Sequence, residues 1–135
     1  MESLSSEQYR PRVLVADDER LIANTLGTIL TRNGFETAVV YDGQQAVDTA
    51  RVWRPDILLS DVVMPALNGV EAAIQICAII PECRVLLFSG QAGTSDLLQA
   101  ARARGHNFEV LPKPIPPGEL LAHLRSALDN SQPRP

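Results

Sequence analysis

The sequence lacks the features of secreted and membrane proteins. It has only two cysteines, Cys77 and Cys83, and their spacing fits no zinc-binding pattern. No apolar run reaches the roughly 18 residues that a membrane-spanning helix needs. The first residues, MESLSSEQYRPR, contain no apolar stretch like that of a secretory signal. We therefore expect a cytoplasmic chain that spans no membrane, with two reduced cysteines in structural positions.

Basic residues are also scarce. Lys and Arg total 12 against 16 Asp and Glu, for a formal net charge of −4. A surface that binds nucleic acid normally has a basic excess, so we expect no nucleic-acid partner. The length of 135 residues fits one domain. We expect that domain over residues 11–129, with a flexible N-terminus of residues 1–10, a flexible, proline-rich tail of residues 130–135 and no output domain.

Two hydrophobic periods alternate along the chain. Short, continuous runs of Val, Ile and Leu predict buried parallel strands at residues 12–16, 37–40, 56–59, 84–88 and 108–111. Between and after them, apolar residues at three- and four-residue spacing predict amphipathic helices around residues 21–30, 46–50, 70–77, 97–101 and 120–128. This alternation predicts an α/β fold, a doubly wound (βα)5 parallel sheet with helices on both faces.

Residues with special backbone or capping properties support these boundaries. Gly34 and Gly105 follow predicted helices, where a left-handed residue commonly ends a helix. Pro117 suits the first turn of the last helix. Asp42 and Asn68 precede the second and third helices and are good N-cap residues.

Polar residues follow four of the five predicted strands. Asp17 and Asp18 follow the first strand, Asp61 the third, Ser89 the fourth and Lys113 the fifth. Ligands of an open α/β sheet bind at this carboxyl edge. Converging carboxylates repel one another unless a cation joins them, and a hard ion such as Mg²⁺ suits oxygen ligands.

Asp61 is the most telling of these residues. It lies in the stretch DILLSDVVMP, where a buried carboxylate without a partner would be costly. A carboxylate beside a metal, the ammonium of Lys113 and the hydroxyl of Ser89 suits phosphoryl transfer. The carboxylate itself can be the nucleophile that forms an acyl phosphate.

Four motifs, in this order and with these gaps, resemble the receiver domain of bacterial two-component response regulators. They are VLVADDE at residues 13–19, ILLSDVVMPALNG at 57–69, VLLFSG at 85–90 and LPKPI at 111–115. The resemblance covers nearly the whole chain. It implies a flavodoxin-like fold with the strand order 2-1-3-4-5 that is typical of this fold group.

The resemblance also implies roles for the edge residues. Asp61 would be the phosphoacceptor, and Lys113 would pair with the phosphoryl group. Asp17, Asp18, Asp61 and the backbone carbonyl of Val63 would hold Mg²⁺. Asp18 would be a direct ligand, and Asp17 would act partly through water.

Partners and output follow from the same resemblance. The donor would be a sensor histidine kinase or a histidine phosphotransfer protein, for which small acyl phosphates can substitute. Phosphorylation would recruit the hydroxyl of Ser89 and shift the population of surface conformations, so that the signal leaves through protein contacts. A cis peptide would precede Pro114. The downstream target is open, and we expect a monomer or weak homodimer.

The sequence departs from the family at the position that usually couples phosphorylation to the surface. Receivers generally have an aromatic residue three positions before the lysine, but here that position is Val110 and the aromatic is Phe108. Either a bulge or loop shift re-aims Phe108, or the coupling uses no aromatic. The family's hydrolysis-tuning positions are Val63 and Gln91, and a valine orients no water, which predicts a long-lived phosphoryl state.

Two other functions remain as alternatives to a phosphoacceptor that only assists its own phosphorylation and dephosphorylation. A metal-dependent phosphohydrolase with an aspartate nucleophile would have Asp-x-Asp and a cap insertion, but this chain has Asp61-Val62-Val63 and no insertion. A binding module that has the fold but no longer takes up a phosphoryl group would not need the acidic residues, the hydroxyl and the lysine. This chain has all of them.

Overall fold

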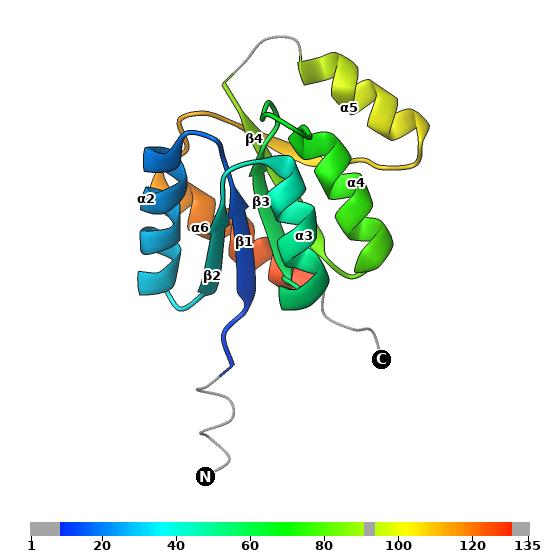
Figure 1. Cartoon of the computed structure of the whole chain (residues 1–135). Helices are drawn as coiled ribbons and strands as arrows, with labels where there is room; N and C mark the ends of the chain where they lie inside the picture. Colours follow the sequence, from blue (N-terminus) through cyan, green and yellow to red (C-terminus); the bar gives the residue numbers. More distant parts are fainter. Residues whose placement is uncertain (1–8, 91–93, 131–135) are drawn as a thin grey trace.

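The computed structural model describes residues 9–90 and 94–130. Within them a single sheet has five strands: β1 (Arg12–Ala16), β2 (Glu36–Val40), β3 (Ile57–Asp61), β4 (Arg84–Ser89) and β5 (Glu109–Pro112). The same residues form five helices: α2 (Arg20–Arg32), α3 (Gly43–Trp53), α4 (Gly69–Ile79), α5 (Thr94–Ala103) and α6 (Pro117–Asn130). The strand order β2-β1-β3-β4-β5 confirms the predicted fold (Figure 1).

All four strand pairs are parallel, so all carboxyl ends lie at one edge of the sheet, at the top of Figure 1. The chain goes from β1 to β2 on one side and then crosses to β3 on the other side. The strand order therefore reverses between β1 and β3, which is where open α/β sheets place their ligands.

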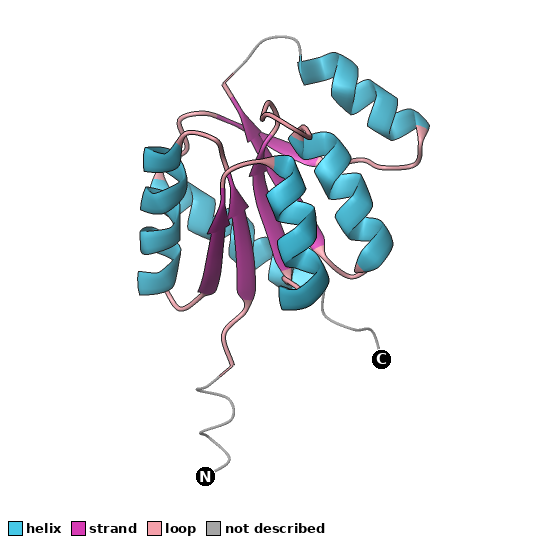
Figure 2. Cartoon of the chain, in the orientation of Figure 1, coloured by secondary structure: helices cyan, strands magenta, loops and turns pink. Residues whose placement is uncertain are grey.

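Helices lie on both faces of the sheet (Figure 2). Alternating strand residues face these two helical layers. One face packs Val13, Val15, Ile57 and Leu59 against α2 and α6. The other packs Leu14 and Leu58 against α3 and α4, and Leu87 against α4 and α5. Because both faces are covered, the strands have no polar side, which explains their continuous apolar runs.

Local signals set the helix ends as predicted. The carboxylate of Asp42 accepts a hydrogen bond from the backbone N–H of Gln45 at 2.7 Å, and Asn68 caps α4 in the same way. Gly34 and Gly105 have φ angles of 96° and 92°, a region that glycine enters at little cost.

Several strand boundaries differ from the prediction by one or two residues, and the differences in β3 and β5 bear on the site. β3 extends to Asp61, because Asp61 pairs in register with Phe88 of β4. β5 begins at Glu109 instead of residue 108 and extends to Pro112, which pairs with Ser89. Asp61 is thus the last residue of a strand, and its pairing with β4 fixes its backbone.

The ends of the predicted domain are partly described. Helix α6 reaches Asn130, one residue past the predicted boundary. Residues 1–8 and 131–135 of the predicted N-terminus and tail lie outside the described residues.

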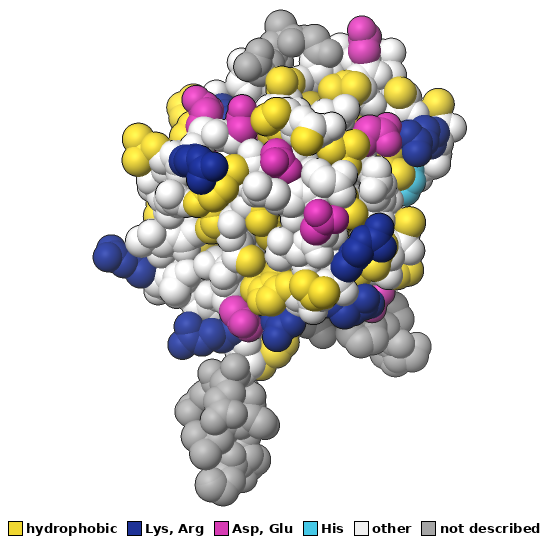
Figure 3. Space-filling model, in the orientation of Figure 1, with side chains coloured by type: hydrophobic (Ala, Val, Ile, Leu, Met, Phe, Trp, Pro, Cys, Tyr) yellow, Lys and Arg dark blue, Asp and Glu magenta, His cyan; other side chains and the backbone are white. Residues whose placement is uncertain are grey.

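None of the described helices is both long and apolar enough to cross a bilayer. On the face in Figure 3, several acidic side chains lie in the upper part, toward the carboxyl edge of the sheet.

Candidate functional site

Three carboxylates converge at the point where the strand order reverses. Asp17 follows β1, Asp18 is the next residue, and Asp61 ends β3. One oxygen of each lies within 4.8 Å of the others. Asp17 is fully buried, Asp61 is 6% exposed and Asp18 is exposed to solvent. The sheet therefore holds two charges out of water and leaves the third at the surface.

Lys113, from the loop after β5, provides the positive charge that faces this cluster. Its Nζ lies 3.1 Å from Asp17 Oδ2 and 3.4 Å from Asp61 Oδ2. Burial lowers the pKa of Lys113, but its hydrogen bond to Asp17 and the charge of Asp61 outweigh burial and raise the pKa overall. The side chain is therefore an ammonium at neutral pH. The peptide bond between Lys113 and Pro114 is cis, as expected.

Asp61 is held in an environment that favours its protonated form. Burial raises its pKa, Lys113 lowers it and Asp17 raises it, and the balance brings the pKa of Asp61 to about 6. Its Oδ1 accepts a hydrogen bond from the backbone N–H of Val62 at 2.9 Å. Near neutral pH most of Asp61 is ionised, and it is an electron-rich carboxylate with one positive neighbour.

The cluster suits a hard divalent cation. Asp17, Asp18 and Asp61 offer carboxylate oxygens, the ligand type that Mg²⁺ prefers. The site opens into a hollow of about 440 Å³ lined by Asp18, Glu19, Asp61, Val63, Gly90 and Lys113. Mg²⁺ usually keeps several waters, and this hollow has room for them.

Ser89 ends β4 next to Lys113. It is half-buried, and its backbone carbonyl accepts a hydrogen bond from the N–H of Lys113 at 3.1 Å. The structure thus brings all the predicted residues to one edge of the sheet: Asp17, Asp18, Asp61, Val63, Ser89 and Lys113. Gln91 lies outside the described residues.

Two residues that sequence reasoning missed support the backbone of Asp61. The hydroxyl of Ser60 is buried and donates to the carbonyl of Asp61 at 2.8 Å. Gly69 donates its N–H to Val62 O at 2.7 Å. A Cβ on Gly69 would collide with the carbonyl of Asp61, so this close approach requires glycine. The only sequence signal was the Asn-Gly pair, which also marks the start of α4.

Phe108 directly precedes the first residue of β5, whereas Ser89 is level with the last residue, Pro112, so Phe108 does not reach Ser89. Glu109 pairs with Leu86, and the pairing continues without a bulge to Pro112 and Ser89. Phe108 is therefore level with Val85, four residues or about 13 Å from Ser89 along β4. The bulge that would re-aim Phe108 is absent from this pairing.

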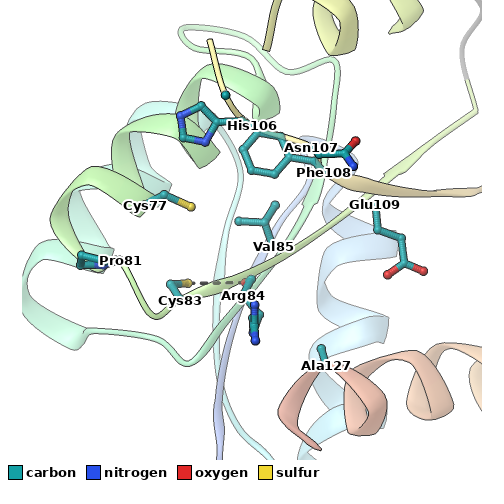
Figure 4. Close-up of a pocket in the computed structure, with 11 residues that line it drawn as sticks. Cys77, Pro81, Cys83, Arg84, Val85, His106, Asn107, Phe108, Glu109 and Ala127 are labelled. Carbon is teal, nitrogen blue, oxygen red and sulfur yellow. Dashed lines mark hydrogen bonds between the residues drawn. The ribbon is translucent and has the colours of Figure 1, made fainter. Parts of the chain in front are cut away.

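Phe108 is instead one of the residues that line a separate hollow of about 500 Å³ (Figure 4). Its ring stacks on His106, with centroids 5.4 Å apart. Cys77 and Cys83 line the same hollow as free thiols. Burial raises the pKa of both thiols, that of Cys83 to about 12, so they are poor nucleophiles and fit structural positions.

Comparison with known proteins assigns the family. A model of the response regulator receiver domain matches residues 13–125. The chain belongs to this family. Receiver domains are the phosphoacceptors of two-component signalling, so the chain has a phosphoacceptor signalling role. The phosphohydrolase alternative has no support.

Curated relatives agree with this assignment. The DNA-binding response regulator MtrA of Mycolicibacterium smegmatis is 30% identical over 132 residues, which cover 96% of this chain and 55% of the relative. The response regulator MprA of Mycobacterium avium is 33% identical over 122 residues, 90% of this chain and 53% of the relative. The receiver chain thus spans about half the length of these relatives.

Solved structures show the same fold. The signal receiver domain of a modulated diguanylate cyclase from Desulfovibrio desulfuricans G20 is 30% identical, with a TM-score of 0.78. It matches 91% of this receiver chain and 97% of the other. The chemotaxis response regulator CheY4 of Vibrio cholerae is 27% identical, with a TM-score of 0.75 and coverage of 88% and 99%.

Proposed function

We propose that this receiver takes a phosphoryl group onto Asp61 from a phosphohistidine of a sensor histidine kinase or a histidine phosphotransfer protein. The observation that carries this assignment is the position of Lys113 Nζ, 3.4 Å from Asp61 Oδ2 at the edge where three carboxylates meet. We further propose that the protein acts in the cytoplasm and passes its signal on through protein contacts.

In the transfer step a carboxylate oxygen of Asp61 attacks phosphorus. A P–O bond forms, the P–N bond to the donor imidazole breaks, and the imidazole leaves with the electron pair. The ammonium of Lys113 offsets negative charge on the phosphoryl oxygens, and the hydroxyl of Ser89 donates to one of them. Asp61 acts in its ionised form, so the reaction slows as the pH falls below the carboxylate pKa.

Mg²⁺ would be held by Asp17, Asp18, Asp61 and the backbone carbonyl of Val63. The solvent-exposed Asp18 is free to serve as a direct ligand, whereas Asp17 already accepts hydrogen bonds from Lys113 and from the N–H of Glu19. Asp17 would therefore act partly through water. When bound, the ion would neutralise negative charge on the phosphoryl group.

The test is intact mass after incubation with acetyl phosphate, with and without Mg²⁺. The wild type should gain one phosphoryl group only with Mg²⁺, and Asp61→Asn should gain none. Asp48→Asn is a matched control, because Asp48 is an exposed carboxylate on α3. A gain in Asp61→Asn would disprove the assignment of the acceptor. A wild type that gains no mass and binds no beryllofluoride would contradict the proposal as a whole.

The exposed side chain of Val63 predicts slow loss of the phosphoryl group. It is 45% exposed, borders the hollow and has no polar atom to orient a water for attack. Val63→Asn should speed hydrolysis about tenfold, the effect of one well-placed hydrogen bond. Loss of mass over time after removal of acetyl phosphate measures this rate. Val52→Asn, another exposed valine far from the site, is the control, and an unchanged or slower rate in Val63→Asn would contradict the prediction.

A further inference from the structure

Glu19 contacts the site although, within the motif at residues 13–19, only Asp17 and Asp18 were predicted to have a role. It is the N-cap residue of α2, and its backbone N–H donates to Asp17 Oδ1 at 2.9 Å. Its side chain does not cap the helix. Instead, Glu19 Oε1 lies 3.3 Å from Lys113 Nζ and accepts a hydrogen bond from it.

This contact completes a set of three acceptors around one ammonium. Lys113 Nζ has carboxylate oxygens at 3.1 Å from Asp17, 3.3 Å from Glu19 and 3.4 Å from Asp61. Lys113 Nζ donates hydrogen bonds to Asp17 and Glu19 and forms an ion pair with Asp61, so three carboxylates together surround an ammonium that has three protons. A phosphoryl group on Asp61 that needs this ammonium must therefore displace one of the three.

Glu19 is the partner that is released at the smallest cost. The side chain of Asp17 is fully buried, so loss of its contact with Lys113 would leave a buried negative charge without its cationic partner. Asp61 carries the incoming group. The side chain of Glu19 is 63% exposed, so water solvates its carboxylate once the contact breaks.

We infer that Glu19 is a positioning residue, which holds the ammonium of Lys113 in the unphosphorylated protein and yields it to the phosphoryl group. The inference rests on the proposed role of Asp61 as acceptor. Glu19 thus opposes phosphorylation in the resting site. An exposed ion pair is weak, so removing the contact should change rates and affinities by only about two- to fivefold.

The test compares Glu19→Gln with Glu36→Gln. Glu36 is a matched control, because its Oε1 also lies 3.3 Å from a cation, Arg12 Nε, but on the edge strand β2. With Mg²⁺ present, Glu19→Gln should be phosphorylated by acetyl phosphate about two to five times faster than wild type. It should also bind beryllofluoride tighter by a similar factor, an equilibrium readout that a purely structural role of Glu19 would not change. Glu36→Gln should match wild type in both.

Glu19→Asp separates the contact from the charge. It keeps the negative charge but is one methylene shorter, so it should lose the contact and behave like Glu19→Gln. Wild-type behaviour of Glu19→Asp would overturn the positioning role and leave only charge repulsion. Equal rates for Glu19→Gln and Glu36→Gln would also overturn it. A wild type that takes up no phosphoryl group and binds no beryllofluoride would instead refute the proposed function.

Discussion

Replacing Lys113 by glutamine should lower the free energy of unfolding by about 3 kcal/mol in metal-free buffer near pH 7. The ammonium is the cation that faces Asp17, which is fully buried, and Asp61, which is nearly so. Breaking a buried ion pair by removing one partner typically costs about 3–5 kcal/mol, because the other charge remains out of water. The lower value applies because glutamine still donates a hydrogen bond and the lysine side chain is 17% exposed.

Urea unfolding with a chelator present measures this loss. Arg104→Gln is the control, because Arg104 pairs with Glu71 at 2.8 Å on an exposed surface, where a pair contributes about 1 kcal/mol or less. Mg²⁺ should restore part of the stability of Lys113→Gln, since a cation bound only by the folded state stabilises it. If Lys113→Gln loses no more than Arg104→Gln, the buried carboxylates do not depend on the lysine.

The fold was predictable because a parallel sheet covered on both faces leaves a strong trace in the sequence. Its strands have no solvent face, so the run at residues 13–16 is apolar throughout, and polar residues such as Asp17 follow where the strand ends. The same rule located the site. Asp61 and Lys113 lie at the ends of apolar strands, and Lys113 is the single lysine of a chain that otherwise uses arginine.

Other features were not predictable because they depend on how neighbouring side chains meet. Glu19 and Lys113 are 94 residues apart, and no local pattern says that one reaches the other. The position of Phe108 depends on the β4–β5 register, which the sequence leaves open between a bulge and a regular strand. Gly69 approaches Asp61 because the loop between them folds back, and the Asn-Gly pair is equally explained by a helix start.

The acidic site is under electrostatic strain in the absence of a cation. Asp17, Asp18, Glu19 and Asp61 are four carboxylates, and Lys113 provides one positive charge among the residues that line the hollow or contact it. Repulsion of this kind destabilises the ionised form of the most buried groups. The same repulsion favours binding of a cation. A site built for Mg²⁺ and a phosphoryl group therefore lowers the stability of the metal-free fold. Substitution of Asp61 should show this as a change in the free energy of unfolding.

Asp61→Asn should accordingly stabilise the metal-free protein at pH 7. The pKa of Asp61 is raised from 3.8 to about 6, so the folded state binds this proton more tightly than the unfolded state. Stability must then fall as the pH rises from about 4 to about 6. At about 1.4 kcal/mol per pKa unit, ionisation of Asp61 costs the fold about 3 kcal/mol above this window. Asparagine carries no charge and avoids this cost.

The pH dependence distinguishes this cause from a change in packing. Urea unfolding of wild type and Asp61→Asn should differ by about 3 kcal/mol at pH 7 and by much less near pH 4, where Asp61 is protonated in the folded state and about half protonated in the unfolded state. Asp48→Asn, at an exposed position, should show no such difference. Mg²⁺ should stabilise the wild type more than Asp61→Asn, because the variant has lost one ligand and the charge repulsion that the ion relieves. A constant difference at both pH values would mean that burial of the Asp61 charge does not limit stability.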